Sequence, residues 1–224
     1  MSEPNWALSR KRQRLTERAQ IIQSIRSFFI DRGYLEVETP YRIPANAPEP
    51  HIDAVASGTC ALHSSPELAM KRMLAAGYEQ LFQICRVWRN GECGQFHLPE
   101  FTLLEWYRVG IDYNALMNEC MELLFVLLPG GKLDRGGRTI DLTMPWQKLT
   151  VTEAFTRYAS MDLNQALASD CFEEILTRDV EPHLGKEKPT FLTEYPSSLA
   201  ALARSKPGEP QVAERFELYI DGLE

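Results

Sequence analysis

The apolar residues near the start of the chain recur three or four positions apart, the spacing of a helix with one buried stripe. The predicted stripe consists of Leu15, Ala19, Ile22, Ile25 and Phe29. A glycine at position 33 is expected to stop this helix, and residues 34–39 then favour a short strand ended by a proline. A proline-rich loop with Pro44, Pro48 and Pro50 is predicted next.

Two apolar, β-prone runs follow, Gln80 to Trp88 and Phe101 to Val109. A polar loop with two glycines separates them, so the pattern predicts an antiparallel pair with a long connection. Before this pair, Ser64-Ser65-Pro66-Glu67 predicts the start of a helix that runs to about residue 77. A capping residue stands there before a proline at the first helical position, where the missing N–H costs nothing.

Past residue 110 the pattern indicates further helices and strands. Asp112 is a capping residue for a helix whose apolar stripe includes Leu116 and Leu123. The later predicted elements are helices at Val151–Tyr158 and Phe172–Thr177 and strands at Thr190–Glu194 and Arg215–Ile220. Long antiparallel strands mixed with helices, without an internal repeat, predict one α+β domain over residues 1–224.

Charge and cysteine content narrow the class of protein. The 224 residues carry a formal charge of −7, which argues against binding nucleic acid mainly through phosphate neutralisation. The basic run Arg10–Arg14 is interpreted as the solvated start of a helix. Five cysteines without C-x-x-C spacing favour neither a disulfide framework nor a structural zinc site. With no signal-peptide pattern and no apolar run of membrane-spanning length, a cytoplasmic protein is predicted.

Chemistry-bearing side chains gather on the predicted strand pair. Alternation places Phe101, Leu103, Glu105 and Tyr107 on one face, and the partner strand ends at Arg89. An aromatic ring, a carboxylate, a phenol and an arginine on one surface suit a nucleotide-plus-amine ligand. The alternative interpretation is that Arg89 and Glu105 pair with each other across the hairpin, because charges inside an apolar strand need partners.

Several strings resemble the motifs of class II aminoacyl-tRNA synthetases. The string Arg32–Pro40 resembles motif 1, and Arg86–Asn90 followed by Pro99–Tyr107 resembles motif 2. The segments Gly185–Phe191 and Ala213–Tyr219 resemble the lysyl branch in particular. The chain is therefore identified as a member of the lysyl-tRNA-synthetase-like group, which implies an antiparallel sheet flanked by helices.

Only about thirty residues precede motif 1, too few for an OB-fold anticodon-binding domain. Within the resemblance this indicates the elongation factor P lysyltransferases. These ligases attach a lysine-type amino acid, (R)-β-lysine in the known members, to a lysine side chain of elongation factor P. Two alternatives stay open: a tRNA ligase or tRNA-binding paralogue, and a non-catalytic module that binds nucleotide, an amino acid or a partner. The sequence leaves α-lysine and β-lysine undecided.

The resemblance also implies roles for single residues. The family uses ATP to form an aminoacyl-adenylate, from which an acceptor displaces AMP. By similarity Arg89 clamps the α-phosphate through its planar fork, Phe101 stacks on adenine, and His97 lies near the triphosphate. The residues that match the binders of the substrate's amino groups are Ser65, Glu67 and Tyr107. For Glu67 the alternative is a favourable acid in a first helical turn.

Glu224 matches an acid that binds Mg²⁺, and motif 1 with Pro40 implies a homodimer. The chain departs from the family at Gly91, where a glutamate is expected two residues after the motif 2 arginine. Two interpretations stay open: Glu92 substitutes in binding ATP, or adenine recognition is weakened. Gln95 and Leu98 replace an arginine and an asparagine. Because the chain ends before motif 3, weak or absent adenylation is expected of these 224 residues.

Overall fold

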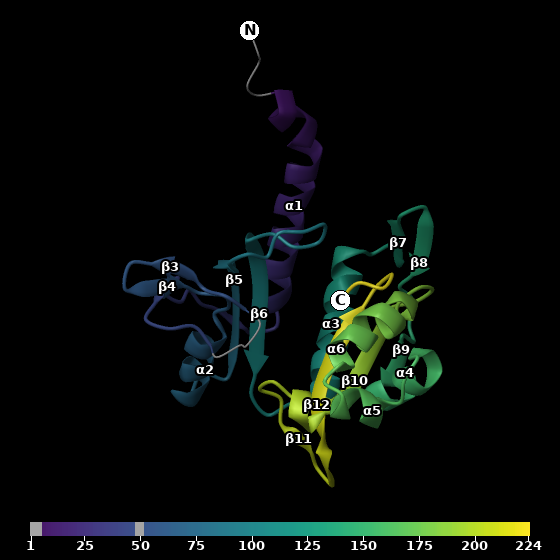
Figure 1. Ribbon diagram of the computed structural model, residues 1–224. Coiled ribbons are helices and arrows are strands. Elements are labelled where there is room, and N and C mark those ends of the chain that lie inside the picture. Colours follow the sequence, from purple (N-terminus) through teal and green to yellow (C-terminus); the bar gives the residue numbers. More distant parts are fainter. Residues whose placement is uncertain (1–5, 48–51) are drawn as a thin grey trace. The chain divides into compact units, whose positions relative to one another are not determined.

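The computed structural model describes residues 6–47 and 52–224, and the chain divides into two compact units, residues 1–111 and 112–224 (Figure 1). These are the N-terminal unit and the C-terminal unit below. The expectation of one domain over the whole chain stays a prediction. Pro48 and Pro50 of the predicted loop lie outside the described residues.

A three-stranded sheet forms the centre of the N-terminal unit, in the order β1 (Leu35–Glu36), β5 (Gln80–Trp88), β6 (Glu100–Arg108). Strands β5 and β6 pair antiparallel in unbroken register from Gln80 opposite Arg108 to Trp88 opposite Glu100. The predicted hairpin is confirmed. Strand β1 pairs parallel with β5 and is shorter than the run expected from residues 34–39.

The long helix α1 (Trp6–Ile30) packs on this sheet through its last turns. Phe28 and Phe29 are buried, and the Phe29 ring stacks on Phe82 with centroids 5.0 Å apart. The predicted stripe is buried only at this end, because Leu15 is 51% exposed. Residues 10–14 are exposed in the helix, as the interpretation of the basic run requires. Helix α1 covers the face of the sheet on which Phe82 lies. Because side chains alternate along a strand, Gln83 and Glu105 lie on the opposite face.

Two smaller elements complete the N-terminal unit. An antiparallel sheet with the order β2 (Arg42–Ile43), β4 (Cys60–Leu62), β3 (Val55–Ser57) has no counterpart in the sequence prediction. Helix α2 (Glu67–Ala75) begins one residue later than expected, with Pro66 as the residue before its first turn. Met70 is fully buried and anchors this helix.

The C-terminal unit contains a four-stranded sheet in the order β11 (Ser205–Lys206), β12 (Glu209–Tyr219), β10 (Thr190–Pro196), β9 (Gln147–Thr150). Strand β10 pairs antiparallel with β12 and parallel with β9. The predicted strands are confirmed, and β12 begins earlier than expected. A separate hairpin joins β7 (Lys132–Arg135) and β8 (Arg138–Asp141).

Both faces of this sheet are covered by helices. Leu192 points into the larger core, which helix α4 (Val151–Tyr158) shares with α5 and α6, and the next residue along, Phe191, packs with α3 on the other face. The remaining helical bounds are α3 (Tyr113–Leu127), α5 (Leu163–Ala168), α6 (Phe172–Ile175), a π-helical stretch Leu176–Val180 and short 3-10 turns at Glu181–His183 and Ser197–Leu199.

The predicted cap of α3 is confirmed, because the Asp112 carboxylate accepts a hydrogen bond from the Ala115 N–H at 3.0 Å. Sheets flanked by helices in both units give the α+β class that the sequence predicted. Among the described residues, no helix combines the length and the apolar character needed to cross a bilayer.

Candidate active site

The β5–β6 hairpin places the motif 2 side chains on one surface. Because residues opposite each other in the ladder share a face, Phe101 opposite Val87, Glu105 opposite Gln83 and Tyr107 opposite Leu81 all project away from α1. The face that was predicted from alternation is therefore present in the structure.

Glu105 lies at the centre of a small polar cluster on this face. Its Oε2 accepts a hydrogen bond from the Ser65 hydroxyl at 2.7 Å, and its Oε1 accepts from the Tyr107 hydroxyl. Burial raises the pKa of the Glu105 carboxyl, although both hydroxyl donors act in the other direction. Burial and the neighbouring Glu105 raise the pKa of Tyr107. The structure thus brings Ser65 and Tyr107 together around a half-buried carboxylate, an arrangement that suits a cation.

Glu105 was not among the residues predicted to bind substrate. The sequence pattern that could have indicated it is the alternation of side chains along the strand. The alternative that it pairs with Arg89 is not what the structure shows, since hydroxyl groups occupy both its oxygens. Gln83, its neighbour across the ladder, is buried. Its amide atoms make no hydrogen bond within the described residues beyond a weak contact with the Cys85 thiol.

Glu67 is the first residue of α2, and the Lys71 ammonium donates a hydrogen bond to its carboxylate at 2.6 Å. Its charge contributes to the raised pKa of Glu105, so the two carboxylates lie within electrostatic reach. The backbone N–H of Glu67 donates to the Ser65 hydroxyl at 3.0 Å, which fixes the turn before the helix. Glu67 therefore is an acid in the first turn of a helix, as the alternative interpretation proposed, and it also borders the polar cluster around Glu105.

Three of the four residues predicted to bind ATP lie together at the end of the hairpin. The Arg89 guanidinium carbon lies 5.2 Å from the centre of the Phe101 ring, and Arg89 Nη1 lies 4.0 Å from Glu92 Oε2. Arg89 Nε is buried and has no hydrogen-bond partner within the described residues. A half-buried guanidinium with one buried, unused donor fits an anionic ligand such as a nucleotide phosphate.

The fourth residue, His97, lies exposed in the loop between the strands. Its backbone carbonyl accepts a hydrogen bond from the Gly94 N–H at 3.1 Å, and within the described residues no hydrogen bond or ion pair joins its ring to Arg89. Gly91 adopts φ +78°, a conformation that favours glycine. The glutamate expected at this position would thus require a different course of the loop, and Glu92 is the acid that approaches Arg89.

In the C-terminal unit, Glu224 lies beside a second carboxylate, Glu217 on β12. Burial and the charge of Glu224 raise the pKa of Glu217 to about 7, while Arg215 pairs with Glu217 at 2.9 Å and acts in the opposite direction. The chain turns back after β12 through a bridge between Ile220 and Leu223. Two adjacent carboxylates are suitable hard ligands for Mg²⁺. The sequence prediction named Glu224 and missed Glu217. Within the described residues no group of three or more His, Cys, Asp or Glu side chains could hold a metal.

The fold and the motif 2 hairpin are typical of class II tRNA synthetases, and comparison with known families gives the same class. A profile for class II tRNA synthetases (D, K and N) matches residues 6–224, and the chain belongs to this family of ligases, which use ATP.

Comparison with individual proteins identifies relatives within this family. The chain is 41% identical to the elongation factor P--(R)-beta-lysine ligase of Salmonella gallinarum and 39% identical to those of Salmonella arizonae and Salmonella paratyphi B. Each match covers 100% of this chain and 75% of the relative.

Proposed function

We propose that this protein uses ATP to activate a lysine-type amino acid as an aminoacyl-adenylate and transfers it to a lysine side chain of elongation factor P. The observation that carries the proposal is the half-buried Glu105 carboxylate held by Ser65 and Tyr107 on the motif 2 hairpin. The names of the relatives supply the acceptor and favour (R)-β-lysine over α-lysine.

The polar cluster is suited to a protonated amine. An ammonium group donates to Glu105, and its positive charge favours the ionised carboxylate that burial otherwise disfavours. The Tyr107 and Ser65 oxygens, together with the buried Gln83 amide, offer further acceptors. A neutral or anionic side chain would gain none of these interactions and would leave the buried groups without partners.

At the other end of the hairpin, Arg89 contacts the α-phosphate and Phe101 stacks on adenine, with Glu92 beside them. A carboxylate oxygen of the amino acid attacks the α-phosphorus and pyrophosphate leaves. The lysine amine of the acceptor protein then attacks the acyl carbon, an amide forms, and AMP leaves with the electron pair of the broken bond. Arg89 would neutralise charge on the phosphorus oxygens during the first step. We include His97 as a contact of the triphosphate.

Magnesium is part of the proposal. Glu217 and Glu224 would hold an Mg²⁺ ion, which supplies charge neutralisation at the phosphates. Replacing Glu224 with Gln should then weaken the Mg²⁺ dependence of ATP binding in a titration at fixed ATP. An unchanged dependence would exclude this residue as a ligand.

We also propose a homodimer through motif 1, in the cytoplasm. Strand β1 is a sheet edge, and Leu35 on it is 49% exposed, while Pro40 is exposed as well. All five cysteines are free, as in a reducing compartment. Light scattering should give twice the chain mass at micromolar concentration, and Leu35→Lys should halve it. A monomeric unmodified chain would exclude the dimer.

The experiment that tests the function is calorimetric titration with ATP and Mg²⁺, with and without (R)-β-lysine or lysine. Arg89→Ala should abolish saturable ATP binding. Arg86→Ala is the matched control, because Arg86 lies three positions earlier near the end of β5, projects to the face opposite that of Phe101 and pairs with the exposed Glu100 at 3.8 Å. Equal loss in both variants, or no binding in the unmodified chain, would contradict the ATP site.

Transfer is tested next by incubating the chain with ATP, the amino acid and elongation factor P, and measuring the mass of the acceptor. The expected result is a mass increase of one aminoacyl group that Glu105→Gln prevents. Nucleotide binding without turnover would instead support a non-catalytic module that binds nucleotide. The differences from the family motif at Gly91 and Leu98 favour this second function.

A further inference from the structure

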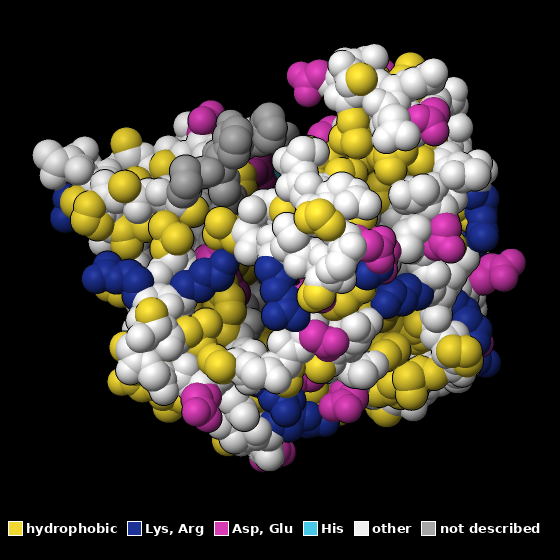
Figure 2. Space-filling view, turned by 90° about the horizontal axis from the view of Figure 1, so that it is seen from below, with side chains coloured by type: hydrophobic (Ala, Val, Ile, Leu, Met, Phe, Trp, Pro, Cys, Tyr) yellow, Lys and Arg dark blue, Asp and Glu magenta, His cyan; other side chains and the backbone are white. Residues whose placement is uncertain are grey.

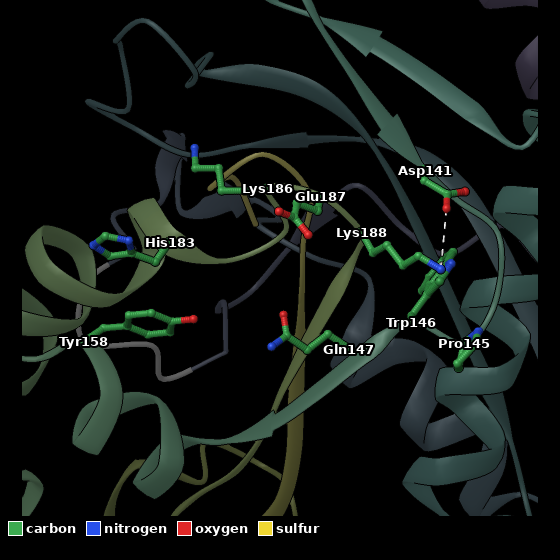
Figure 3. Close-up of a pocket in the computed structure, with 9 residues that line it drawn as sticks. All are labelled: Asp141, Pro145, Trp146, Gln147, Tyr158, His183, Lys186, Glu187 and Lys188. Carbon is green, nitrogen blue, oxygen red and sulfur yellow. Dashed lines mark ion pairs between the residues drawn. The ribbon is translucent and has the colours of Figure 1, made fainter.

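The ion pairs of the C-terminal unit differ in how firmly each partner is held. Many involve exposed side chains, and Figure 2 shows Lys and Arg (dark blue) close to Asp and Glu (magenta) on one face of the molecule. At the rim of a cavity of about 650 Å³, Lys188 lies 3.5 Å from Asp141, and the two side chains are 35% and 46% exposed (Figure 3). Water competes for both groups of such a pair, so it does little to fix the position of either one.

The Arg215 guanidinium on β12 is held from three directions instead. Its Nε donates to Glu217 Oε1 at 2.9 Å, and its Nη2 lies 2.9 Å from the same oxygen. Its Nη1 donates to the Leu199 carbonyl at 2.8 Å, and the guanidinium carbon lies 4.4 Å from the centre of the Tyr195 ring. Contacts on two edges of the planar fork and on its face leave the guanidinium little freedom to turn.

The groups that hold Arg215 are themselves fixed by the core of the unit. Tyr195 is 2% exposed and packs with the residues of α4 and α6. Leu199 ends the 3-10 turn that directly follows β10, and it packs against the same core. Arg215 and Glu217 are two positions apart on β12, so their side chains project from the same face of the strand. The core therefore sets the position of the guanidinium, and the guanidinium sets that of the Glu217 carboxylate.

The contact also determines which oxygen of Glu217 is left for a ligand. Both short contacts of Arg215 go to Oε1, and Oε2 takes no part in the ion pair. The Glu224 carboxylate lies within hydrogen-bonding range of the Glu217 carboxyl group. A carboxylate that is fixed through one oxygen presents the other in a defined direction, which is the arrangement that metal-binding carboxylates require.

We propose that Arg215 is a positioning residue of the Mg²⁺ site, which fixes Glu217 Oε1 and so directs Oε2 to an ion held jointly with Glu224. The inference rests on the proposed Mg²⁺ ligands, and Arg215 itself touches neither the ion nor the nucleotide. Loss of a hydrogen bond to a metal-binding carboxylate typically weakens metal binding about 10- to 100-fold. A positive charge near a cation acts in the opposite direction, because like charges repel. Orientation and charge can therefore be separated by substitution.

Arg215→Lys keeps the charge and removes the fork, since a single ammonium cannot contact Glu217 Oε1 and the Leu199 carbonyl as the guanidinium does. Arg215→Gln removes both. The measurement is a titration of the full chain with Mn²⁺ alone, as a probe for the Mg²⁺ site, in which EPR spectroscopy gives the free Mn²⁺ and no turnover is needed. We expect the unmodified chain to bind most tightly, Arg215→Gln less tightly, and Arg215→Lys least, about tenfold or more below the unmodified chain.

The matched control is Arg204→Gln, because Arg204 is 65% exposed and pairs with Glu214 on the same strand. It should leave Mn²⁺ binding unchanged, and circular dichroism shows whether each variant is folded. If only one Arg215 variant folds, weaker Mn²⁺ binding by that variant supports the inference.

Two sets of outcomes would overturn it. Undiminished binding by Arg215→Lys, or tighter binding by Arg215→Gln than by the unmodified chain, would show that Arg215 acts only through its charge, and the Mg²⁺ site would remain. Absence of Mn²⁺ binding by the unmodified chain, or binding that Glu224→Gln does not weaken, would exclude the Mg²⁺ site itself and the positioning role with it.

Discussion

At the scale of single residues, the protonation of Glu105 controls what its face of the hairpin can bind. Burial raises the pKa of this carboxyl above the ordinary value, so the empty site holds a proton at a higher pH than an exposed glutamate does. A protonated amine requires the ionised form. Binding of the amine below the raised pKa must therefore release a proton, and the affinity falls as the pH decreases through that pKa.

We predict that the affinity for lysine or (R)-β-lysine rises with pH through the raised pKa of Glu105 and then stays level until the amine itself loses its proton. Calorimetry in buffers of different ionisation enthalpy would detect the released proton directly. Glu105→Gln should weaken amine binding about a hundredfold and remove the pH dependence, since a charge-assisted pair with a half-buried carboxylate is lost. ATP affinity is the internal control, and a pH profile identical in both chains would contradict the assignment.

Much of this site could be predicted from residues that stand in fixed strings. Arg89, Phe101 and Glu92 were predicted from motif 2, and the structure brings them together. Glu105 was visible only as a carboxylate on an alternating strand, because the donors that hold it include Ser65, forty positions away in sequence. Glu217 was missed for a similar reason, since a glutamate within a strand of mixed polarity does not reveal which carboxylate faces it.

At the scale of elements, the loop before β10 depends on the absence of a side chain at Gly185. A Cβ there would lie 2.3 Å from the Tyr219 carbonyl oxygen, and the backbone has φ +68°. Both facts favour glycine, because L residues rarely adopt this conformation and a backbone atom cannot move aside as a flexible side chain can. The close approach joins the loop before β10 to the end of β12.

We predict that Gly185→Ala lowers the free energy of unfolding by about 4 kcal/mol, as the loop must separate from β12. Gly208→Ala is the matched control: φ there is +83°, and its Cβ would meet no atom within 4 Å. It should cost only about 1 kcal/mol, the strain of the conformation alone. Urea unfolding followed by circular dichroism measures both, and equal losses would show that the contact with Tyr219 is unimportant.

Strong local patterns predicted the elements that the structure contains. The β5–β6 hairpin, α4 and the cap of α3 all rest on periodicity or on a capping residue within a few positions. The stripe of α1 was wrong at Leu15, because helical spacing says nothing about which turns meet a partner. The short strands β2, β3 and β4 have two or three residues each, too few for any periodicity to show.

At the scale of the whole molecule, each unit has its own buried residues and its own sheets. The order of strands in the C-terminal unit, in which β10 lies between β9 and β12, depends on contacts between residues 16 to 43 positions apart. Pattern and propensity carry no information at that range. Local patterns alone predicted only the α+β class. The resemblance to class II synthetases added the prediction of a sheet flanked by helices.

The net charge of the chain bears on whether its acceptor is a protein or an RNA. The chain belongs to a family of tRNA synthetases, yet it carries a formal charge of −7. Affinity for a polyanion depends on phosphate neutralisation and falls steeply with salt, so an acidic chain should not retain tRNA in a filter-binding assay at about 0.15 M salt. An acceptor protein does not require such neutralisation, and elongation factor P should be modified at the same salt concentration. Saturable tRNA binding at this salt concentration, with aminoacylation of the tRNA, would show that the acceptor is an RNA and not a protein.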